Sequence, residues 1–232
     1  MNNYKIINGF KLRYYNSKIS FIDSFKDKKG ILMALNAAKI HQSNQLLKKI
    51  SYEGIAYPDG IGAVLALYIK GVKNAIRIPG CELWIDIIKH LKNTKSFYII
   101  GSTDLVLNKV ISKLKFEFKE IKILGFRNGF FNNNEIDDII IDLKTKKPDI
   151  VFVALGSPRQ ELFMQSLLRN YKALYMGLGG SLDVYSGRFS RSPKMIRNNG
   201  FEWLHRLLKD PSRIKRYKII FPFLFNLIRG KY

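Results

Sequence analysis

Residues 150–161 have the sequence IVFVALGSPRQE, in which six consecutive apolar residues are followed by a Gly-Ser-Pro turn. A short apolar run bounded by turn residues is typical of a buried strand. A proline close to the first helical position is typical of a helix N-terminus. The stretch therefore predicts a strand, a tight turn and a helix, the unit from which parallel α/β sheets are built.

The same alternation extends over most of the chain. Strands are expected at 31–35, 96–100, 121–125, 150–154 and 173–176, and helices at 37–50, 61–70, 82–92, 105–116, 135–144 and 160–170. We therefore predict the α/β class, with a Rossmann-like, mostly parallel sheet covered by helices on both faces. Ligands of such sheets bind beyond the carboxyl ends of the strands.

Composition and charge limit the possible functions. The 232 residues carry 40 Lys and Arg against 18 Asp and Glu, a formal net charge of +22, and 47% are apolar. The apolar share is sufficient for a folded core. The charge predicts a polyanionic partner: nucleic acid, an anionic membrane or a phosphorylated substrate. The single cysteine excludes a disulfide scaffold, and the opening residues lack a signal-peptide pattern, so a cytoplasmic location is expected.

The C-terminal part is the most basic. Residues 188–232 contain seven Arg and five Lys against one Glu and one Asp. The apolar stretch 219–228 is about half of the ~20 residues that a membrane-spanning helix needs. Basic residues beside such a stretch are typical of a segment that lies in the bilayer interface, and a helix packed on the domain is the alternative. We therefore divide the chain into an α/β domain at 1–187 and a basic, amphipathic helical appendage at 188–232.

Polar residues follow several of the predicted strands. Asn36 and Lys39 follow the first strand, and Asp59 lies in a Pro-Asp-Gly turn before a helix. Asp59 has two possible roles, an ordinary N-cap of that helix or a general base near an acceptor hydroxyl. Two glycine-containing turns, 156–161 and 176–184, are candidates for phosphate binding, with an ordinary capped turn as the alternative. His, Cys and Asp spacings predict no metal site.

Several motifs in order carry a resemblance to a known family. They are N-A-x-K, P-D-G, R-x-x-G-x-[DE]-L, G-S-P-[RK]-Q-E, M-G-x-G-G-x-x-D-V and a closing G-x-E-W-L-x-R-L-L-x-x-P-S-R-I-K-R. The chain resembles the WecG/TagA/CpsF glycosyltransferases over nearly its whole length. Two departures are Ala34, where relatives often have Thr, and Ala38, where one branch of the family commonly has Glu.

The resemblance implies roles for individual residues. Asp59 matches the proposed general base, Asn36 and Gln160 match polar pocket residues, and Arg77 matches an arginine of the cleft. The substrate-binding residues expected from the motifs are Lys39, Gly156, Ser157, Arg159, Glu161, Gly177, Gly179, Gly180, Asp183, Arg206, Arg213 and Arg216. The last three match arginines thought to close over the site and contact a diphosphate at the membrane.

The resemblance also implies an activity. We expect inverting, metal-independent transfer, with no cofactor, of N-acetylmannosaminuronic acid from UDP to undecaprenyl-diphosphate-linked N-acetylglucosamine, a step of enterobacterial common antigen synthesis. Transfer of N-acetylmannosamine or another hexosamine for teichoic acid or capsule is the alternative. A nucleic-acid-binding protein is a distant third, because the aromatic residues near the basic tail belong to one apolar patch. The expected location is the inner face of the bacterial cytoplasmic membrane, and the oligomeric state stays open.

Overall fold

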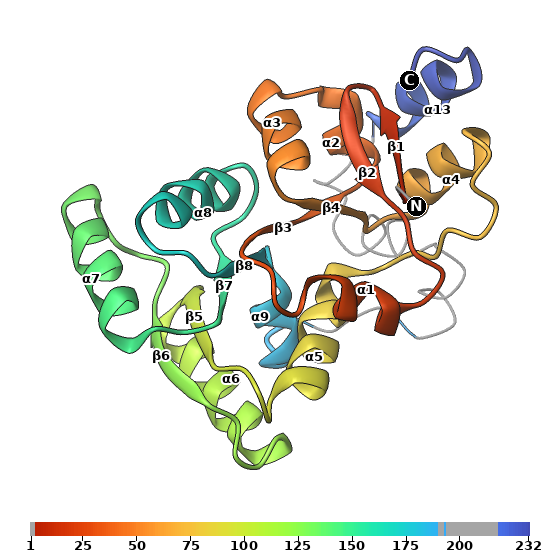
Figure 1. The fold of residues 1–232 in the computed structure, drawn as a ribbon. Helices are drawn as coiled ribbons and strands as arrows, with labels where there is room; N and C mark the ends of the chain where they lie inside the picture. Colours follow the sequence, from red (N-terminus) through yellow and green to blue (C-terminus); the bar gives the residue numbers. More distant parts are fainter. Residues whose placement is uncertain (1–2, 190–192, 194–217) are drawn as a thin grey trace.

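A computed structural model of the chain describes residues 3–189, 193 and 218–232. Its strands form one eight-stranded sheet in the order β1-β2-β4-β3-β8-β7-β5-β6 (Figure 1). The strands are β1 (Tyr4–Ile7), β2 (Phe10–Arg13), β3 (Gly30–Leu35), β4 (Ile55–Pro58), β5 (Phe97–Gly101), β6 (Ile123–Arg127), β7 (Ile150–Ala154) and β8 (Leu174–Gly177). β1 runs antiparallel to β2, and the other neighbouring pairs are parallel.

Helices connect the parallel strands and cover both faces of the sheet. They are α1 (Lys18–Phe25), α2 (Ala37–Gln42), α3 (Gln45–Glu53), α4 (Ile61–Ile69), α5 (Gly80–Leu91), α6 (Asp104–Glu117), the 3-10 turn η1 (Asn133–Glu135), α7 (Ile136–Lys146), α8 (Arg159–Asn170), α9 (Ser181–Tyr185) and α13 (Ile220–Ile228). The predicted α/β class with a mostly parallel sheet is therefore confirmed.

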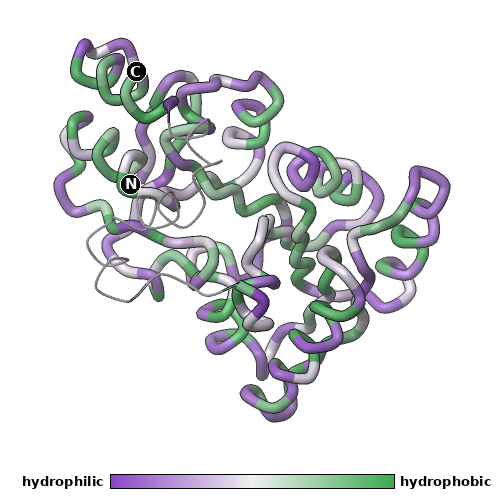
Figure 2. The backbone as a smooth tube through the Cα atoms, turned by 180° about the vertical axis from the view of Figure 1, so that it is seen from behind, coloured by the Kyte–Doolittle hydropathy of each residue, from purple (hydrophilic) through white to green (hydrophobic). Residues whose placement is uncertain are grey.

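The core consists of one apolar layer on each side of the sheet. Along β7, Val151 and Val153 face the layer that contains α2, α3, α4, α7, α8 and α13. Phe152 and Ala154 face the opposite layer, which contains α1, α5, α6 and α9. This alternation follows from the two-residue period of a strand, and burial on both faces explains why the strands are uniformly apolar. In Figure 2 the colouring of many helices alternates between hydrophilic and hydrophobic, as expected where one side of a helix is buried.

The predicted elements appear with small shifts at their ends, with one exception. The segment predicted as a single helix at 37–50 forms α2 and α3, because Ser43 adopts a left-handed conformation (φ 53°) and the Asn44 side chain caps α3. The β1–β2 hairpin was not predicted. Its turn is the dipeptide Asn8-Gly9, both residues at positive φ, and such a dipeptide between apolar residues is a strong hairpin indicator.

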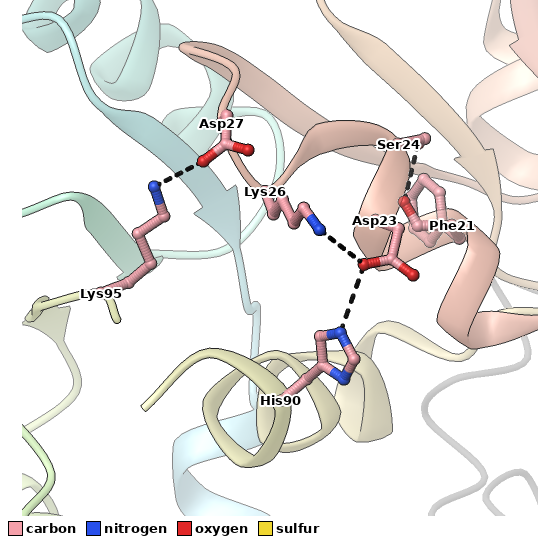
Figure 3. A network of polar contacts seen from close by, with 7 residues as sticks. All are labelled: Phe21, Asp23, Ser24, Lys26, Asp27, His90 and Lys95. Atoms are coloured by element: carbon pink, nitrogen blue, oxygen red, sulfur yellow. Dashed lines mark hydrogen bonds and ion pairs between the residues drawn. The ribbon is translucent and has the colours of Figure 1, made fainter. Parts of the chain in front are cut away.

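Surface ion pairs fasten α1 to the C-terminal end of α5, at the edge of the sheet where the strands begin. The Asp23 carboxylate lies 3.2 Å from the Lys26 ammonium and 3.3 Å from His90 Nε2, and Lys95 pairs with Asp27 at 2.8 Å (Figure 3). Hydrogen bonds from Lys26 and His90 lower the pKa of Asp23. Most of these groups lie at the surface, where water screens their charges, so the pairs contribute little to stability.

The end of the predicted appendage packs on the α/β domain. Phe223 and Leu227 of α13 are buried in the layer that contains α2. The hydroxyl of Tyr232 is hydrogen-bonded to His41 and accepts from the Asn226 amide. In the described part of the chain, no helix has both the length and the apolar character needed to cross a membrane. The boundary near residue 188 stays a prediction.

Candidate active site

Four neighbouring parallel strands end at the same edge of the sheet, in the order β4-β3-β8-β7. Asp59 follows β4, Asn36 follows β3, and the two glycine turns follow β8 and β7. With neighbouring strands about 4.8 Å apart, these four ends span about 14 Å, the scale of a sugar nucleotide. The fold therefore gathers the residues predicted from separate motifs at one edge.

The Asp59 side chain is held by a helix that is distant in sequence. Its Oδ1 accepts a hydrogen bond of 2.6 Å from the backbone N–H of Gly80, the first residue of α5. Its own backbone N–H donates to the Leu35 carbonyl of β3 at 2.9 Å. The N-cap position of α4 is Gly60, with no side-chain cap, so the simple N-cap interpretation of Asp59 is wrong. The N-terminus of α5 instead favours a negative charge on this carboxylate.

Arg77 and Asn36 border Asp59. Arg77 is half-buried, and its Nε donates to the Asp59 carbonyl at 3.3 Å. Asn36 Oδ1 accepts from the Lys39 backbone N–H at 3.1 Å and so caps α2. A Cβ atom at Gly60 would lie 3.5 Å from the Asn36 Cβ, so the residues after β3 and β4 are in close contact.

Tyr57 is a member of this cluster that sequence analysis did not identify. Its side chain is fully buried, and its hydroxyl has no hydrogen-bond partner among the described residues. A Cβ atom at Gly80 would lie 3.1 Å from that hydroxyl and 3.5 Å from Asp59 Oδ1, so the two oxygens border the same glycine. Burial first, and then the nearby Asp59 charge, raise the pKa of Tyr57 well above its usual value. In the sequence, Tyr57 lies in a segment for which no strand was predicted, and only the packing shows where its hydroxyl lies.

A buried polar network connects β3, α8 and the turn after β8. Lys39 Nζ donates to the Ala34 carbonyl at 3.0 Å and to Glu161 Oε1 at 2.7 Å. Gln160 Nε2 donates to the same Glu161 oxygen at 3.1 Å, and Gln160 Oε1 accepts from the Gly179 N–H at 2.9 Å. Gln160 and Glu161 are both buried. The network thus fixes the glycine turn relative to the end of β3.

The charge of Glu161 depends on its partners. Burial acts to raise the pKa of this carboxyl, but the Lys39 charge and the hydrogen bonds from Lys39 and Gln160 outweigh it. The pKa of Glu161 is therefore lowered from its usual value of 4.5. The Lys39 ammonium is mostly buried as well, so each charge depends on the other.

In the two glycine turns, one glycine is tightly packed and the others have unoccupied space beside the backbone. A Cβ atom at Gly177 would lie 2.5 Å from Gln160 Nε2, so only glycine leaves room for the network at that position. A Cβ atom at Gly156, Gly179 or Gly180 would meet nothing within 4 Å, and Gly156 and Gly179 have positive φ. These three glycines therefore leave open space beside the backbone, as an approaching phosphate requires.

Other predicted substrate residues lie around these turns. Ser157 and Arg159 are exposed, and the Arg159 guanidinium lies 5.6 Å from the centre of the Phe131 ring. Asp183 Oδ1 accepts from Arg188 Nη1 at 3.2 Å. Arg206, Arg213 and Arg216 lie outside the described residues. A hollow of about 520 Å³ adjoins α9 and is lined by Thr103, Leu105, Val106, Lys109, Ser186, Gly187 and Arg188.

Within the described ranges, no three His, Cys, Asp or Glu residues come close enough together to hold a metal ion. Metal independence stays a prediction, because residues 190–192 and 194–217 are outside these ranges.

The family model described as the glycosyl transferase WecG/TagA/CpsF family matches residues 10–232. The chain belongs to this family. As a WecG/TagA/CpsF glycosyltransferase, it is an enzyme of the hexosyltransferase type, with a sugar-nucleotide donor and a lipid-linked or glycan acceptor. The match includes both the strand-end cluster and α13, so the family resemblance seen in the sequence motifs is confirmed over nearly the whole chain.

Proposed function

We propose that this glycosyltransferase moves N-acetylmannosaminuronic acid from UDP to undecaprenyl-diphosphate-linked N-acetylglucosamine, with inversion and without metal or cofactor, in enterobacterial common antigen synthesis. The position of Asp59 is the observation that supports the proposed catalytic mechanism. Its carboxylate lies at the carboxyl edge of the sheet, oriented by the Gly80 N–H and two strands away from the glycine turn after β8.

In this proposal Asp59 is the general base. As the acceptor hydroxyl oxygen attacks the anomeric carbon of the donor sugar, its proton passes to the Asp59 carboxylate. The bond between the anomeric carbon and the diphosphate oxygen breaks, and UDP leaves with that electron pair. Fixed N–H groups and cations stabilise the negative charge that develops on the leaving group. The open backbone at Gly156, Gly179 and Gly180 supports placing the diphosphate there.

The remaining predicted residues divide into two groups under this proposal. The first group positions the strand ends, because its side chains form hydrogen bonds or tight contacts within the protein. Its members are Asn36, Lys39, Gln160, Glu161 and Gly177. We assign contact with the donor to Arg77, Arg159, Ser157 and Asp183. Contact with the diphosphate is assigned to Arg206, Arg213 and Arg216. Lys39, Arg77 and Arg159 are the candidate cations for a uronate carboxylate. Lys39 is paired with Glu161, whereas Arg159 is exposed.

The acceptor requires contact with the inner face of the cytoplasmic membrane, and we assign this contact to the appendage at 188–232. The exposed side of α13 supports this assignment. Phe221, Phe225 and Ile228 are exposed by 78%, 52% and 80%, while Lys218, Arg229 and Lys231 around them are basic. Such a side suits a headgroup region better than open water.

Radiolabelled transfer tests the donor assignment. The full chain is given UDP-N-acetylmannosaminuronate or UDP-N-acetylmannosamine with the same undecaprenyl-diphosphate-linked N-acetylglucosamine, and labelled lipid product is counted. We expect the uronate donor to be used with the higher kcat/KM. A clear preference for the neutral donor would instead support a teichoic acid or capsule transferase, and no transfer from either donor would overturn both assignments.

A further inference from the structure

Two helices of the described chain expose only apolar side chains and proline. In α4 the exposed residues are Ile61, Leu65, Tyr68 and Ile69, and in α13 they are Phe221, Pro222, Phe225 and Ile228. A helix that is apolar on its buried and its exposed sides suits a core or a membrane rather than water. Other helices mix charges into their exposed positions, as α6 does with Lys109 and Lys113.

The two helices are in contact. A Cβ atom at Gly62, in the first turn of α4, would lie 3.2 Å from the Phe223 ring of α13 and 2.9 Å from the Ala37 Cβ. Glycine at this position therefore lets α13 pack closely against the start of α4. Figures 1 and 2 show α4 and α13 next to each other at the β1 end of the sheet. Their exposed apolar residues consequently belong to the same end of the molecule.

The charged residues that directly follow α4, and those on either side of α13, are basic. Residues 60–81 and 218–232 contain no Asp or Glu, and their basic residues are Lys70, Lys73, Arg77, Lys218, Arg229 and Lys231. The Arg229 guanidinium lies 4.0 Å from the centre of the exposed Phe225 ring. Exposed apolar side chains surrounded by cations fit an anionic bilayer surface, where the rings enter the interface and the cations meet lipid phosphates.

We propose that α4 is a second bilayer-contacting helix, which together with α13 docks the protein on anionic phospholipid. This inference rests on the proposed membrane acceptor and extends it to the body of the α/β domain. Because α4 begins two residues after Asp59, insertion of α4 brings the base to the membrane surface. A lipid-linked diphosphate then reaches the site without leaving the headgroup region.

Co-sedimentation with vesicles tests the role of α4 without any sugar donor, so it is independent of the transfer assay. Leu65→Gln/Ile69→Gln is compared with Phe116→Gln/Ile141→Gln, which changes more exposed apolar residues on α6 and α7. On vesicles of phosphatidylglycerol and phosphatidylcholine, we expect the α4 variant to bind about tenfold more weakly. The control variant should change binding by less than about twofold. Equal binding by both variants, with circular dichroism showing intact folds, would overturn the proposal.

An environment-sensitive fluorophore gives a second measurement. It is attached at position 65 in a Cys81→Ser/Leu65→Cys chain and, for comparison, at position 116 in a Cys81→Ser/Phe116→Cys chain. We expect emission from position 65 to shift to the blue when phosphatidylglycerol vesicles are added, and emission from position 116 to stay constant. Blue-shifted emission from position 65 before vesicles are added would show that residues 190–217 or a second copy already cover α4, and would reject the bilayer as its partner.

Discussion

The position of Asp59 depends on the strand that precedes it and on a helix that is distant in sequence. Its backbone continues from β4, while its carboxylate accepts from the N-terminus of α5, whose first residue lies 21 positions further along the chain. The general-base role requires both an oriented oxygen and a negative charge, and α5 favours both. Only the packing of α5 against the end of β4 provides this arrangement.

Replacing Asp59 by asparagine tests the role of the charge. Asn keeps an oxygen for the Gly80 N–H but cannot take a proton, so we expect kcat to fall by about 10²–10⁴-fold. UDP affinity, measured by calorimetry, and the melting temperature should stay near the wild-type values. The matched control is Asp137→Asn, an exposed carboxylate of α7. Near-normal turnover by Asp59→Asn would remove this residue from the base role.

The Lys39–Glu161 pair makes a prediction for stability. Lys39→Met leaves the Glu161 carboxylate buried without its cation, so we expect a loss of about 3–5 kcal/mol in the free energy of unfolding. Lys39→Met/Glu161→Gln removes both charges and keeps an acceptor for the Gln160 amide, so it should recover most of that loss. Urea denaturation measures both values. A double variant no more stable than Lys39→Met alone would contradict the charge explanation.

The Lys39–Glu161 pair also predicts how the free energy of unfolding depends on pH. The pKa of Glu161 is lowered in the folded state, so its contribution to stability is fully present above the unfolded value of about 4.5. That contribution is lost as the pH falls through the folded value. We therefore expect the unfolding free energy of the wild type to drop more steeply below pH 4.5 than that of Lys39→Met/Glu161→Gln. Parallel curves for the two proteins would show that Glu161 is not responsible.

At the scale of elements, the turn after β8 depends on its fit to α8. Gln160 leaves no room for a Cβ atom at Gly177, and its amide oxygen holds the Gly179 N–H. The turn is therefore shaped by a side chain from a neighbouring helix as well as by its own glycines.

A double-mutant cycle tests this fit. Gly177→Ala forces the Gln160 side chain to move, and we expect a cost of about 1–3 kcal/mol in the free energy of unfolding. In a Gln160→Ala background the same change should cost clearly less, because the obstructing amide is absent. Gly180→Ala, where a Cβ atom meets nothing within 4 Å, is the control. Equal costs for Gly177→Ala in both backgrounds would mean that the contact is not limiting.

At the scale of the whole molecule, α13 joins the C-terminus to the α/β domain and presents an apolar side to its surroundings. Truncation before Gly200 removes the exposed apolar side of α13 and also its packing on the domain, since Phe223, Leu227 and Tyr232 belong to the core. We expect the truncated chain to leave anionic vesicles and to lose most transfer to the lipid acceptor. Unchanged vesicle binding and activity would reject the assignment of residues 188–232 to the membrane.

A surface variant separates membrane contact from core packing. Phe225→Gln/Ile228→Gln changes two exposed residues of α13 and leaves its buried side intact. We expect weaker vesicle binding at an unchanged melting temperature, as measured by co-sedimentation and calorimetry. A lower melting temperature with normal vesicle binding would assign these residues to folding alone.

Short apolar runs such as 150–154, bounded by turn residues and alternating with helical segments, were enough to predict the α/β architecture. The sequence by itself also determined the family, through ordered motifs that extend to the basic tail. The β1–β2 hairpin could also have been predicted from the sequence, through the dipeptide Asn8-Gly9. The contacts of each motif residue, in contrast, became visible in the folded chain. The bond from Gly80 to Asp59, the buried Lys39–Glu161–Gln160 network and the contact between α4 and α13 join segments that are distant in sequence. Local propensity carries no information about such contacts, since they depend on strand order and on the packing of helices across the sheet.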